Sequence, residues 1–320
     1  MQEKYFVIVN PNAGRGVAKQ EWDKISAYLQ ESGISFESAF TLTRYNAIKI
    51  SAEAIKNGFR NLLVVGGDGS LHEAVNGVFL QQEVASKEIT LAQIPFGTGN
   101  DWGKTYQNPV TYKESVDLLK TGKIIYQDIG KIIYHTSSGL DEKYFINMAG
   151  FGFDAMVLKD VLSKKEKGKG GKLTYLMSLF LNLMKSKHYT ADVKIDDIEF
   201  RDILFTLAAG IGRYNGNGMM QLPFSLPDDG FLDMTWIKDI SKMGVIMNVK
   251  GLFDGTFIKH PKVHQFRGKN IHIKSDEKIL IEADGEFLGH TPAHLSILPK
   301  AVKVIVNNSE VTNKKDKYVS

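Results

Sequence analysis

A glycine-rich loop with one acidic residue is the strongest chemical signal in this sequence. Gly66-Gly67-Asp68-Gly69-Ser70 follows the apolar run Leu62 to Val65 and precedes a helical pattern that begins at Leu71. Glycines at a strand-to-helix turn let backbone N–H groups approach an anion, and the helix N-terminus adds partial positive charge. An acid inside such an anion cradle indicates a cation, so Asp68 predicts a metal–nucleotide complex, held directly or through water. The alternative is a plain tight loop in which Ser70 caps the helix.

Two further polar loops follow other apolar runs. Asn10 to Gly16 comes after the run Tyr5 to Val9 and contains Arg15, whose guanidinium suits phosphate. Pro95 to Asp101 comes after the run Ile89 to Ile94 and carries hydroxyl and amide side chains. The carboxyl ends of parallel strands open on one edge of a doubly wound sheet. The sequence therefore predicts that the three loops converge.

The elements that position these loops alternate along the first third of the chain. Strand-like apolar runs alternate with helical patterns, such as the stripe Trp22, Ile25 and Leu29, after which Gly33 ends the helix. This βαβα rhythm predicts an α/β domain with a parallel sheet over residues 1–125.

The pattern changes after residue 125 to β-type stretches with only two helical patterns, Phe153 to Ser163 and Leu173 to Met184. The predicted strands are Ile124 to Tyr134, Lys143 to Met148, Tyr189 to Ile195, Ile203 to Ala209, Lys278 to Glu282 and Val302 to Val306. We therefore expect an antiparallel, β-rich second domain over residues 126–306. Residues 307–320 are polar and predict a flexible tail.

Composition excludes several classes of protein. The 320 residues include 40 basic and 36 acidic side chains, a net charge of 40 − 36 = +4, which predicts no nucleic-acid partner. The absence of cysteine excludes disulfides, zinc–cysteine sites and thiol nucleophiles. The first apolar run is too short for a secretory signal and is followed at once by Asn10 and Pro11, so we expect a cytoplasmic protein.

Familiar site motifs are absent or misplaced. The sequence has no G-x-x-x-x-G-K-[ST] run and no H-E-x-x-H pair. Gly150 to Ala155 fits G-x-G-x-x-A, but no acid ends a second strand about 20 residues later, as a dinucleotide site requires. His72, on the helix after the glycine loop, is expected to be a surface or capping group.

The ordered motifs resemble the diacylglycerol kinase catalytic domain family, which includes soluble bacterial diacylglycerol kinases and the sphingosine and ceramide kinases. They are Val9-Asn10-Pro11 with Gly14, Gly66 to Gly77, Pro95 to Asp101, Leu226 to Gly230, and Asp284-Gly285-Glu286. The resemblance covers most of the chain. It implies an N-terminal α/β nucleotide-binding domain of the NAD-kinase and diacylglycerol-kinase type, a C-terminal antiparallel β-sandwich for the lipid substrate, and an ATP site in the cleft between them.

The resemblance also implies residue roles. Asp68, Asp284 and Glu286 would form the catalytic centre, with Asp68 near the catalytic Mg²⁺. Residues around the nucleotide would be Asn10, Arg15, Thr43, Gly66, Gly67, Gly69, Ser70, Glu73, Thr98 and Asn100. In some bacterial members the residue that matches Asp229 helps to hold a structural Mg²⁺. Asn46 departs from the family, which often has His at that place.

The later motifs also fit ordinary turns. Asp284-Gly285 suits a two-residue hairpin, although a tight turn is also a rigid way to aim Glu286 across the cleft. Phosphoryl transfer needs charge neutralisation at the phosphates and a positioned base near the acceptor hydroxyl. Either Asp68 or Glu286 could be that base.

Lysines and apolar residues gather between residues 164 and 187. Seven lysines and one glutamate give this segment a charge of 7 − 1 = +6. The run Leu173 to Met184 is apolar around most of a helix and too short to span a bilayer. It could be a buried core helix, a membrane-surface anchor, or the wall of an acyl-chain pocket in which Leu173, Leu176, Leu179 and Phe180 contact lipid. The lysines favour transient contact with anionic membranes.

Residues and resemblance together predict an ATP- and Mg²⁺-dependent lipid kinase, peripherally membrane-associated, that converts diacylglycerol to phosphatidic acid. A sphingoid-base or other lipid kinase is the first alternative. A soluble-substrate kinase of the NAD kinase type shares the Gly-Gly-Asp-Gly turn, but the apolar run and the Asp284 to Glu286 turn disfavour it. A nucleotide-binding regulator without catalysis is disfavoured by the acidic residues. A homodimer is left open.

Overall fold

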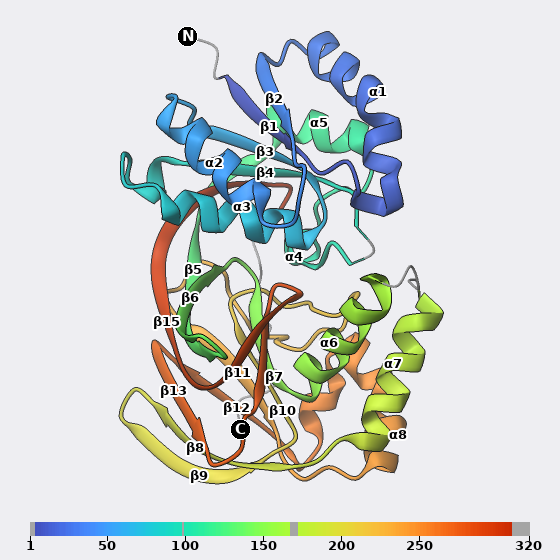
Figure 1. Cartoon of the computed structure of the whole chain (residues 1–320), viewed down its shortest axis with the longest axis vertical. Coiled ribbons are helices and arrows are strands. Elements are labelled where there is room, and N and C mark those ends of the chain that lie inside the picture. Colours follow the sequence, from blue (N-terminus) through green and yellow to red (C-terminus); the bar gives the residue numbers. More distant parts are fainter. Residues whose placement is uncertain (1–3, 98, 167–171, 309–320) are drawn as a thin grey trace.

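The first domain is a parallel sheet between two layers of helices (Figure 1). The computed structural model describes residues 4–97, 99–166 and 172–308, and the side chains of these residues outside 165–176. Four parallel strands are hydrogen-bonded in the order β2–β1–β3–β4. They are β1 (Tyr5–Val9), β2 (Phe36–Phe40), β3 (Asn61–Gly66) and β4 (Thr90–Pro95).

Successive side chains of these strands bury against different helices. On β1, Val7 and Val9 lie in one core with α1 (Val17–Glu31) and α5 (Tyr112–Thr121). Ile8 lies in a second core with α2 (Asn46–Lys56) and α3 (Asp68–Leu80). Side chains alternate in direction along a strand, so a strand that is apolar throughout predicts burial on both faces.

The second domain is an antiparallel β-sandwich, as predicted. One layer has the order β12–β11–β10–β7–β14 and comprises β7 (Met148–Gly152), β10 (Thr206–Gly210), β11 (Leu232–Ile237), β12 (Val263–Gly268) and β14 (Leu280–Ala283). The other comprises β5 (Lys123–Thr136), β6 (Gly139–Phe145), β8 (Tyr189–Ile195), β9 (Ile198–Leu204), β13 (Asn270–Ser275) and β15 (Glu286–Val306). Phe151, Trp236 and Leu295 are among the side chains buried between the layers.

Strand β15 belongs to both domains. It pairs with β13 and β5 of the sandwich, and then Lys303 and Val304 pair in parallel with Thr90 and Leu91 of β4. Val302, Val304 and Val306 are buried in the core of the first domain. The end of the segment predicted as the second domain therefore completes the sheet of the first.

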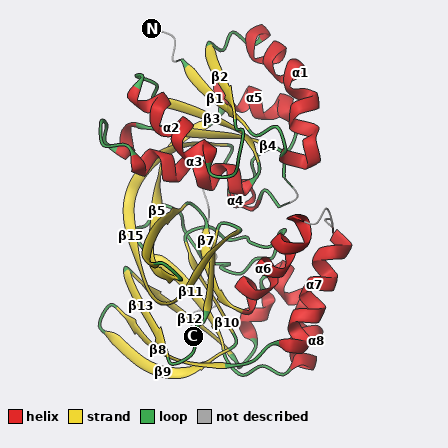
Figure 2. Ribbon diagram, in the orientation of Figure 1, coloured by secondary structure: helices red, strands yellow, loops and turns green. Residues whose placement is uncertain are grey.

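Three helices lie together on one side of the sandwich (Figure 2). The two predicted helices are present as α6 (Phe153–Glu166) and α7 (Lys172–Lys185), and a third, α8 (Lys242–Asp254), was not predicted. Val157, Leu183 and Ile240 share a small core beside these helices. None of the described helices has the length and apolar character needed to cross a membrane.

The predicted strand Lys143 to Met148 is divided. β6 ends at Phe145 and β7 begins at Met148. The intervening N–H groups of Ile146 and Asn147 donate to the side chain of Asp284. A carboxylate thus replaces the neighbouring strand as the hydrogen-bond partner of this backbone.

Gly77 allows α2 and α3 to pack closely. A Cβ at this position would lie 2.4 Å from Ile48 O and 2.5 Å from Ser51 Cβ. We predict that Gly77→Ala lowers the free energy of unfolding by about 1–3 kcal/mol, because the added methyl overpacks a helix crossing. Urea denaturation measures the loss, with Lys49→Ala on the exposed face of α2 as the control. Equal stability of Gly77→Ala and the wild-type protein would contradict the prediction.

Candidate active site

The three predicted loops meet where the first domain faces the second. Asn10 Nδ2 donates to Ser70 Oγ over 2.8 Å, which joins the loops after β1 and β3. A Cβ on Gly67 would lie 3.3 Å from Gly97 Cα, so the loops after β3 and β4 touch through their backbones. Glycine is needed at this contact because any side chain would separate the loops.

Asp68 is the first residue of α3 and lies among other acids. Burial raises the pKa of Asp68 to about 6, and the nearby carboxylates of Asp101 and Asp284 also raise it. Hydrogen bonds from the backbone of Asp101 and Trp102 act in the opposite direction. A carboxylate in this environment gains from a cation, because a cation offsets both burial and repulsion.

Three oxygen atoms, here called the Asp68–Asp101 oxygen cluster, converge around Gly99. The place of a Cβ on Gly99 would lie 3.0 Å from Asp68 Oδ2, 3.1 Å from Asp101 Oδ2 and 3.5 Å from Asn217 Oδ1. Hard oxygen donors of this kind fit Mg²⁺. No group of three or more His, Cys, Asp or Glu side chains able to hold a metal occurs in the described part of the chain, so an amide would have to complete this donor set.

Asn217 and Lys104 fix the orientation of Asp101. The backbone N–H of Asn217 donates to Asp101 Oδ2 over 2.9 Å, and Lys104 Nζ lies 2.6 Å from Asp101 Oδ1. Asn217 belongs to the second domain, so this carboxylate is held from both sides of the domain interface.

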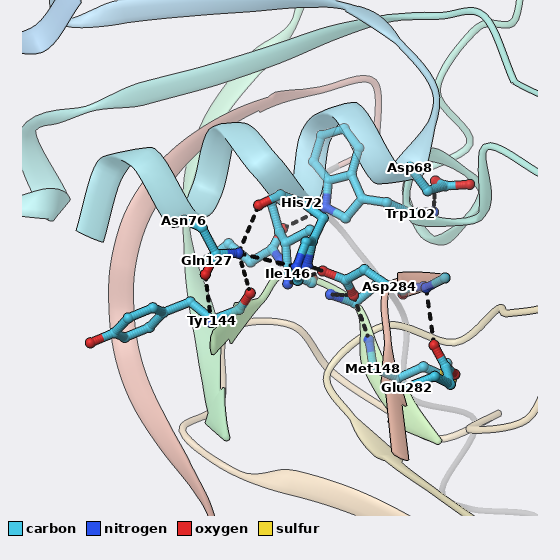
Figure 3. A network of polar contacts seen from close by, with 12 residues as sticks. Asp68, His72, Asn76, Trp102, Gln127, Tyr144, Ile146, Met148, Glu282 and Asp284 are labelled. Atoms are coloured by element: carbon cyan, nitrogen blue, oxygen red, sulfur yellow. Dashed lines mark hydrogen bonds and ion pairs between the residues drawn. The ribbon is translucent and has the colours of Figure 1, made fainter. Parts of the chain in front are cut away.

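Asp284 accepts hydrogen bonds at both carboxylate oxygens (Figure 3). Oδ1 accepts the N–H groups of Asn147 and Met148, and Oδ2 accepts that of Ile146, over 2.9–3.1 Å. Oδ2 also lies 3.1 Å from His72 Nδ1. Because these donors occupy the buried carboxylate, Asp284 holds the backbone and His72 in place.

His72 is buried, and the expectation of a surface or capping group was wrong. Only 2% of its surface is exposed, because the second domain covers this face of α3. Its Nδ1 faces the carboxylate of Asp284, and its Nε2 lies 3.2 Å from Asn76 Nδ2. Asn76 Nδ2 also donates to the backbone carbonyl of His72 over 2.9 Å, so the ring and its own backbone share this amide. Asn76 in turn exchanges two hydrogen bonds with the backbone of Tyr144 on β6.

Glu286 lies over the N-terminal turn of α3. Its Oε1 would be 3.0 Å from a Cβ on Gly69, and its Oε2 pairs with the guanidinium of Arg44. Only 14% of the Glu286 side chain is exposed. The structure therefore brings Glu286 and Asp68 to neighbouring positions on one helix terminus.

Glu73 caps a neighbouring helix. It accepts hydrogen bonds from the backbone N–H groups of Tyr45 (2.9 Å) and Ala47 (3.0 Å) at the start of α2. Burial raises the pKa of Glu73 above its ordinary value. In this structure Glu73 thus positions the loop that carries Thr43 and Arg44.

The other predicted nucleotide residues lie around the same loops. Arg15 and Thr43 are exposed, and Arg15 has the left-handed backbone angle φ = 62°. Asn100 Nδ2 donates to Gly97 O over 3.1 Å, while its Oδ1 is buried with no hydrogen-bond donor among the described residues. Thr98 lies outside the described residues.

Asp229 is ion-paired. Its Oδ2 lies 2.5 Å from Nη2 of Arg267, whose guanidinium also pairs with Asp233. Arginine supplies positive charge at the place where a structural Mg²⁺ was expected, and that Mg²⁺ stays a prediction.

The predicted lipid contacts divide into two groups. The side chains of Leu173 and Leu176 lie outside those that the structure describes. Leu179 packs against the small core beside α6, and Phe180 is 53% exposed. The interpretation of α7 as a buried core helix is wrong for residues 177–185, whose side chains the structure describes, because several large apolar ones are exposed.

Sequence reasoning missed several residues near the site, namely Arg44, Lys104, Asn217 and Glu282. Asp101 lay inside a predicted loop without an assigned role. The signal for Asn217 was present as Gly216-Asn217-Gly218, a glycine-flanked amide. Glu282 sits in an apolar strand, where a charged residue is unusual and could have been singled out.

Family comparisons agree with this geometry. The diacylglycerol kinase catalytic domain matches residues 4–132, and the YegS C-terminal NAD kinase beta sandwich-like domain matches residues 147–306. A diacylglycerol kinase of Staphylococcus carnosus (strain TM300) is 26% identical over 317 residues, which cover 97% of this chain and 99% of that protein. A diacylglycerol kinase of Mycobacterium tuberculosis (strain CDC 1551 / Oshkosh) is 27% identical, with 94% of each chain covered.

Solved structures share the fold. A diacylglycerol kinase crystal structure from Bacillus anthracis str. Sterne superposes with a TM-score of 0.70 at 22% identity, covering 97% of this chain and 98% of that one. Yeast NADH kinase complexed with NADH superposes with a TM-score of 0.56 at 12% identity, covering 100% and 89%. With its two matching domains in this order and spanning most of its length, the chain belongs to the diacylglycerol kinase family of enzymes.

Proposed function

We propose that this kinase transfers the γ-phosphate of ATP to the hydroxyl of a lipid, most simply diacylglycerol, to give phosphatidic acid. The observation that carries the proposal is the position of Glu286 beside the N-terminus of α3, next to the Asp68–Asp101 oxygen cluster. In this arrangement Glu286 can act as the base, and the N-terminus of α3 can bind the negatively charged phosphates. The name of the Staphylococcus and Mycobacterium relatives supports diacylglycerol as the acceptor.

The nucleotide phosphates would bind at the glycine loop. Gly66 and Gly67 let Ser70 and Gly97 pack against the loop backbone, and the start of α3 adds partial positive charge. Asn10 and Ser70, joined by a hydrogen bond, form the polar wall beside it. Arg15 and Arg44 are the cations from the neighbouring loops.

Asp68, Asp101 and Asn217 would hold Mg²⁺. When bound, the ion neutralises charge on the phosphates during transfer. Backbone hydrogen bonds hold two of these side chains in place. The N–H of Trp102, on α4 (Asp101–Thr105), donates to Asp68, and the N–H of Asn217 donates to Asp101. No cation is needed at Asp284, whose oxygens accept hydrogen bonds from the backbone.

Glu286 is the proposed base. Asp68 faces the oxygen cluster, and Asp284 is occupied by donors, so Glu286 is the acid placed to accept a proton from the acceptor hydroxyl. Arg44 contacts Glu286 in this structure. A phosphate at the glycine loop would compete for that guanidinium and leave the carboxylate available to the lipid.

Membrane contact is proposed for the outer face of α7 and α8, here called the α7–α8 face. Eight large apolar side chains are 42–76% exposed there: Met177, Phe180, Leu181, Met184, Met243, Ile246, Met247 and Phe253. Lys185 and Lys250 are exposed on the same helices. An apolar surface with lysines suits an anionic lipid surface, and the kinase would act there as a peripheral protein.

The activity is tested by transfer of labelled γ-phosphate from Mg-ATP into the organic phase. The acceptors are micelles of diacylglycerol, sphingosine, ceramide and phosphatidylglycerol, with NAD in the aqueous phase, and Asp68→Ala is the blank. We expect labelled phosphatidic acid that the blank does not produce. Label in another lipid would identify that lipid as the substrate in place of diacylglycerol. Label only in the aqueous phase would overturn the lipid kinase proposal.

Glu286→Gln separates catalysis from nucleotide binding. We expect kcat to fall by about two to four orders of magnitude, because a general base acts mainly in the transition state. The dissociation constant of ATP should change less than about threefold, since Glu286 lies on the acceptor side. Fluorescence titration with a nucleotide analogue gives the binding constant. Equal losses in kcat and in affinity would contradict the role of Glu286.

The α7–α8 face is tested with phosphatidylglycerol vesicles. At about 1 kcal/mol per charge near the surface, Lys185→Gln/Lys250→Gln should lower partitioning about thirtyfold at low salt and less at high salt. The control removes two exposed lysines from the first domain, Lys56→Gln/Lys120→Gln. Equal sedimentation of both double variants with the vesicles would refute this membrane face.

A further inference from the structure

Glu282 is a buried acid that the proposed mechanism does not use. It lies on β14, is 2% exposed, and precedes Asp284 by two residues (Figure 3). A Cβ on Gly150 would lie 2.6 Å from Glu282 Oε1, so the neighbouring strand has no side chain where this carboxyl sits. An acid in such a place needs partners for both oxygens.

One oxygen of Glu282 holds the turn that carries Glu286. Glu282 Oε2 accepts the backbone N–H of Gly285 over 3.0 Å. Asp284 and Gly285 have left-handed backbone angles, φ = 49° and 81°. The hydrogen bond from Gly285 therefore stabilises a two-residue turn in which a non-glycine residue is strained.

The other oxygen holds a loop that reaches the first domain. Glu282 Oε1 accepts from Asn215 Nδ2 over 3.0 Å. Asn215 and Met219 pair through their backbones, which closes a short loop with Asn217 at its tip. Asn217 N donates to Asp101 Oδ2, and Asn217 Oδ1 is part of the oxygen cluster around Gly99.

The electrostatic environment supports this bridging role. Burial is the main reason that the pKa of Glu282 is raised to about 8, and the carboxylates of Asp154 and Asp284 contribute to the rise. Hydrogen bonds from Gly285 and Asn215 lower it. These two hydrogen bonds join the two loops through one side chain and offset part of the cost of its burial.

We propose that Glu282 is a positioning residue that ties the Asp284–Glu286 turn to the Asn215–Met219 loop. It thereby fixes Glu286 relative to the Asp68–Asp101 oxygen cluster. The consequence for catalysis rests on the proposed function, whereas the mechanical coupling of the two loops does not.

The chemistry of the contact suggests a paired substitution. In Glu282→Gln, the amide oxygen can still accept from Gly285, but the new NH2 group then faces the NH2 group of Asn215. Asn215 cannot turn its amide without penalty, because its Oδ1 accepts the N–H of Gly216 over 2.8 Å. Adding Asn215→Asp supplies acceptors for both the glutamine and Gly216, so the double variant restores the bridge.

Steady-state kinetics test the consequence for catalysis. We expect kcat for the lipid to fall on the order of tenfold in Glu282→Gln and to return to within about threefold of wild type in Glu282→Gln/Asn215→Asp. Asn215→Ala, which leaves Glu282 in place, should reproduce the loss and provides a second route if Glu282→Gln folds poorly. Tyr134→Phe is the matched control, because it removes another partly buried hydrogen bond of the sandwich, to Asp141, and should leave kcat unchanged.

Amide hydrogen exchange tests the coupling of the loops without any lipid. In Glu282→Gln, exchange should rise at least about tenfold in both residues 215–219 and residues 284–288, and the double variant should reverse it. Faster exchange in only one of the loops, or a double variant as impaired as Glu282→Gln, would overturn the inference. Absence of lipid phosphorylation by the wild-type protein would overturn the proposed function but would leave this exchange experiment fully interpretable.

Discussion

The buried carboxylate of Asp284 is the constraint on which the site depends. It accepts three backbone N–H groups, from Ile146, Asn147 and Met148, and it faces His72. A buried acceptor of this kind is costly unless it is fully hydrogen-bonded, and removing it would leave several buried donors without partners. The same carboxylate therefore sets where β7 begins, how the turn before Glu286 is shaped, and where α3 of the first domain meets the second. Asp284 fixes how the two domains lie relative to each other at the site, because both domains hydrogen-bond to its side chain.

The charges around this constraint are unbalanced. Four carboxylates lie close together at residues 68, 101, 284 and 286, and the cations paired with them in the described residues are Arg44 and Lys104. Burial first and the neighbouring carboxylates second raise the pKa of Asp68 to about 6, so this acid is partly protonated near that pH. Binding of a cation at the oxygen cluster would favour loss of that proton, so metal affinity and proton release are coupled. In the proposed reaction, phosphate would add negative charge to a site with more acids than bases, and a cation and the start of α3 would together offset it.

The sequence predicted local features of this arrangement better than distant ones. The loops at the ends of β1, β3 and β4 were predicted because glycines and polar residues follow apolar strands directly. His72 was misplaced because its burial depends on the second domain, which no pattern near residue 72 encodes. The bridge from Glu282 to Asn215 joins residues 67 positions apart, and only the fold brings them together. Helix α8 was missed because its sequence, KMGVIMNVKGLFD, is apolar with two internal glycines and has no regular polar face.

Strand β15 has a consequence for how the chain is made. Its last residues complete the parallel sheet beside β4 and bury Val302, Val304 and Val306 in the core of the first domain. During synthesis, the N-terminal strands and helices emerge from the ribosome long before this final strand does. Until β15 is made, the β4 edge of the first domain's sheet would stay unpaired, and unpaired edges are prone to pairing with the wrong strand. Completion of both domains is thus a joint event, and the kinase gains its assembled site only after β15 has been translated.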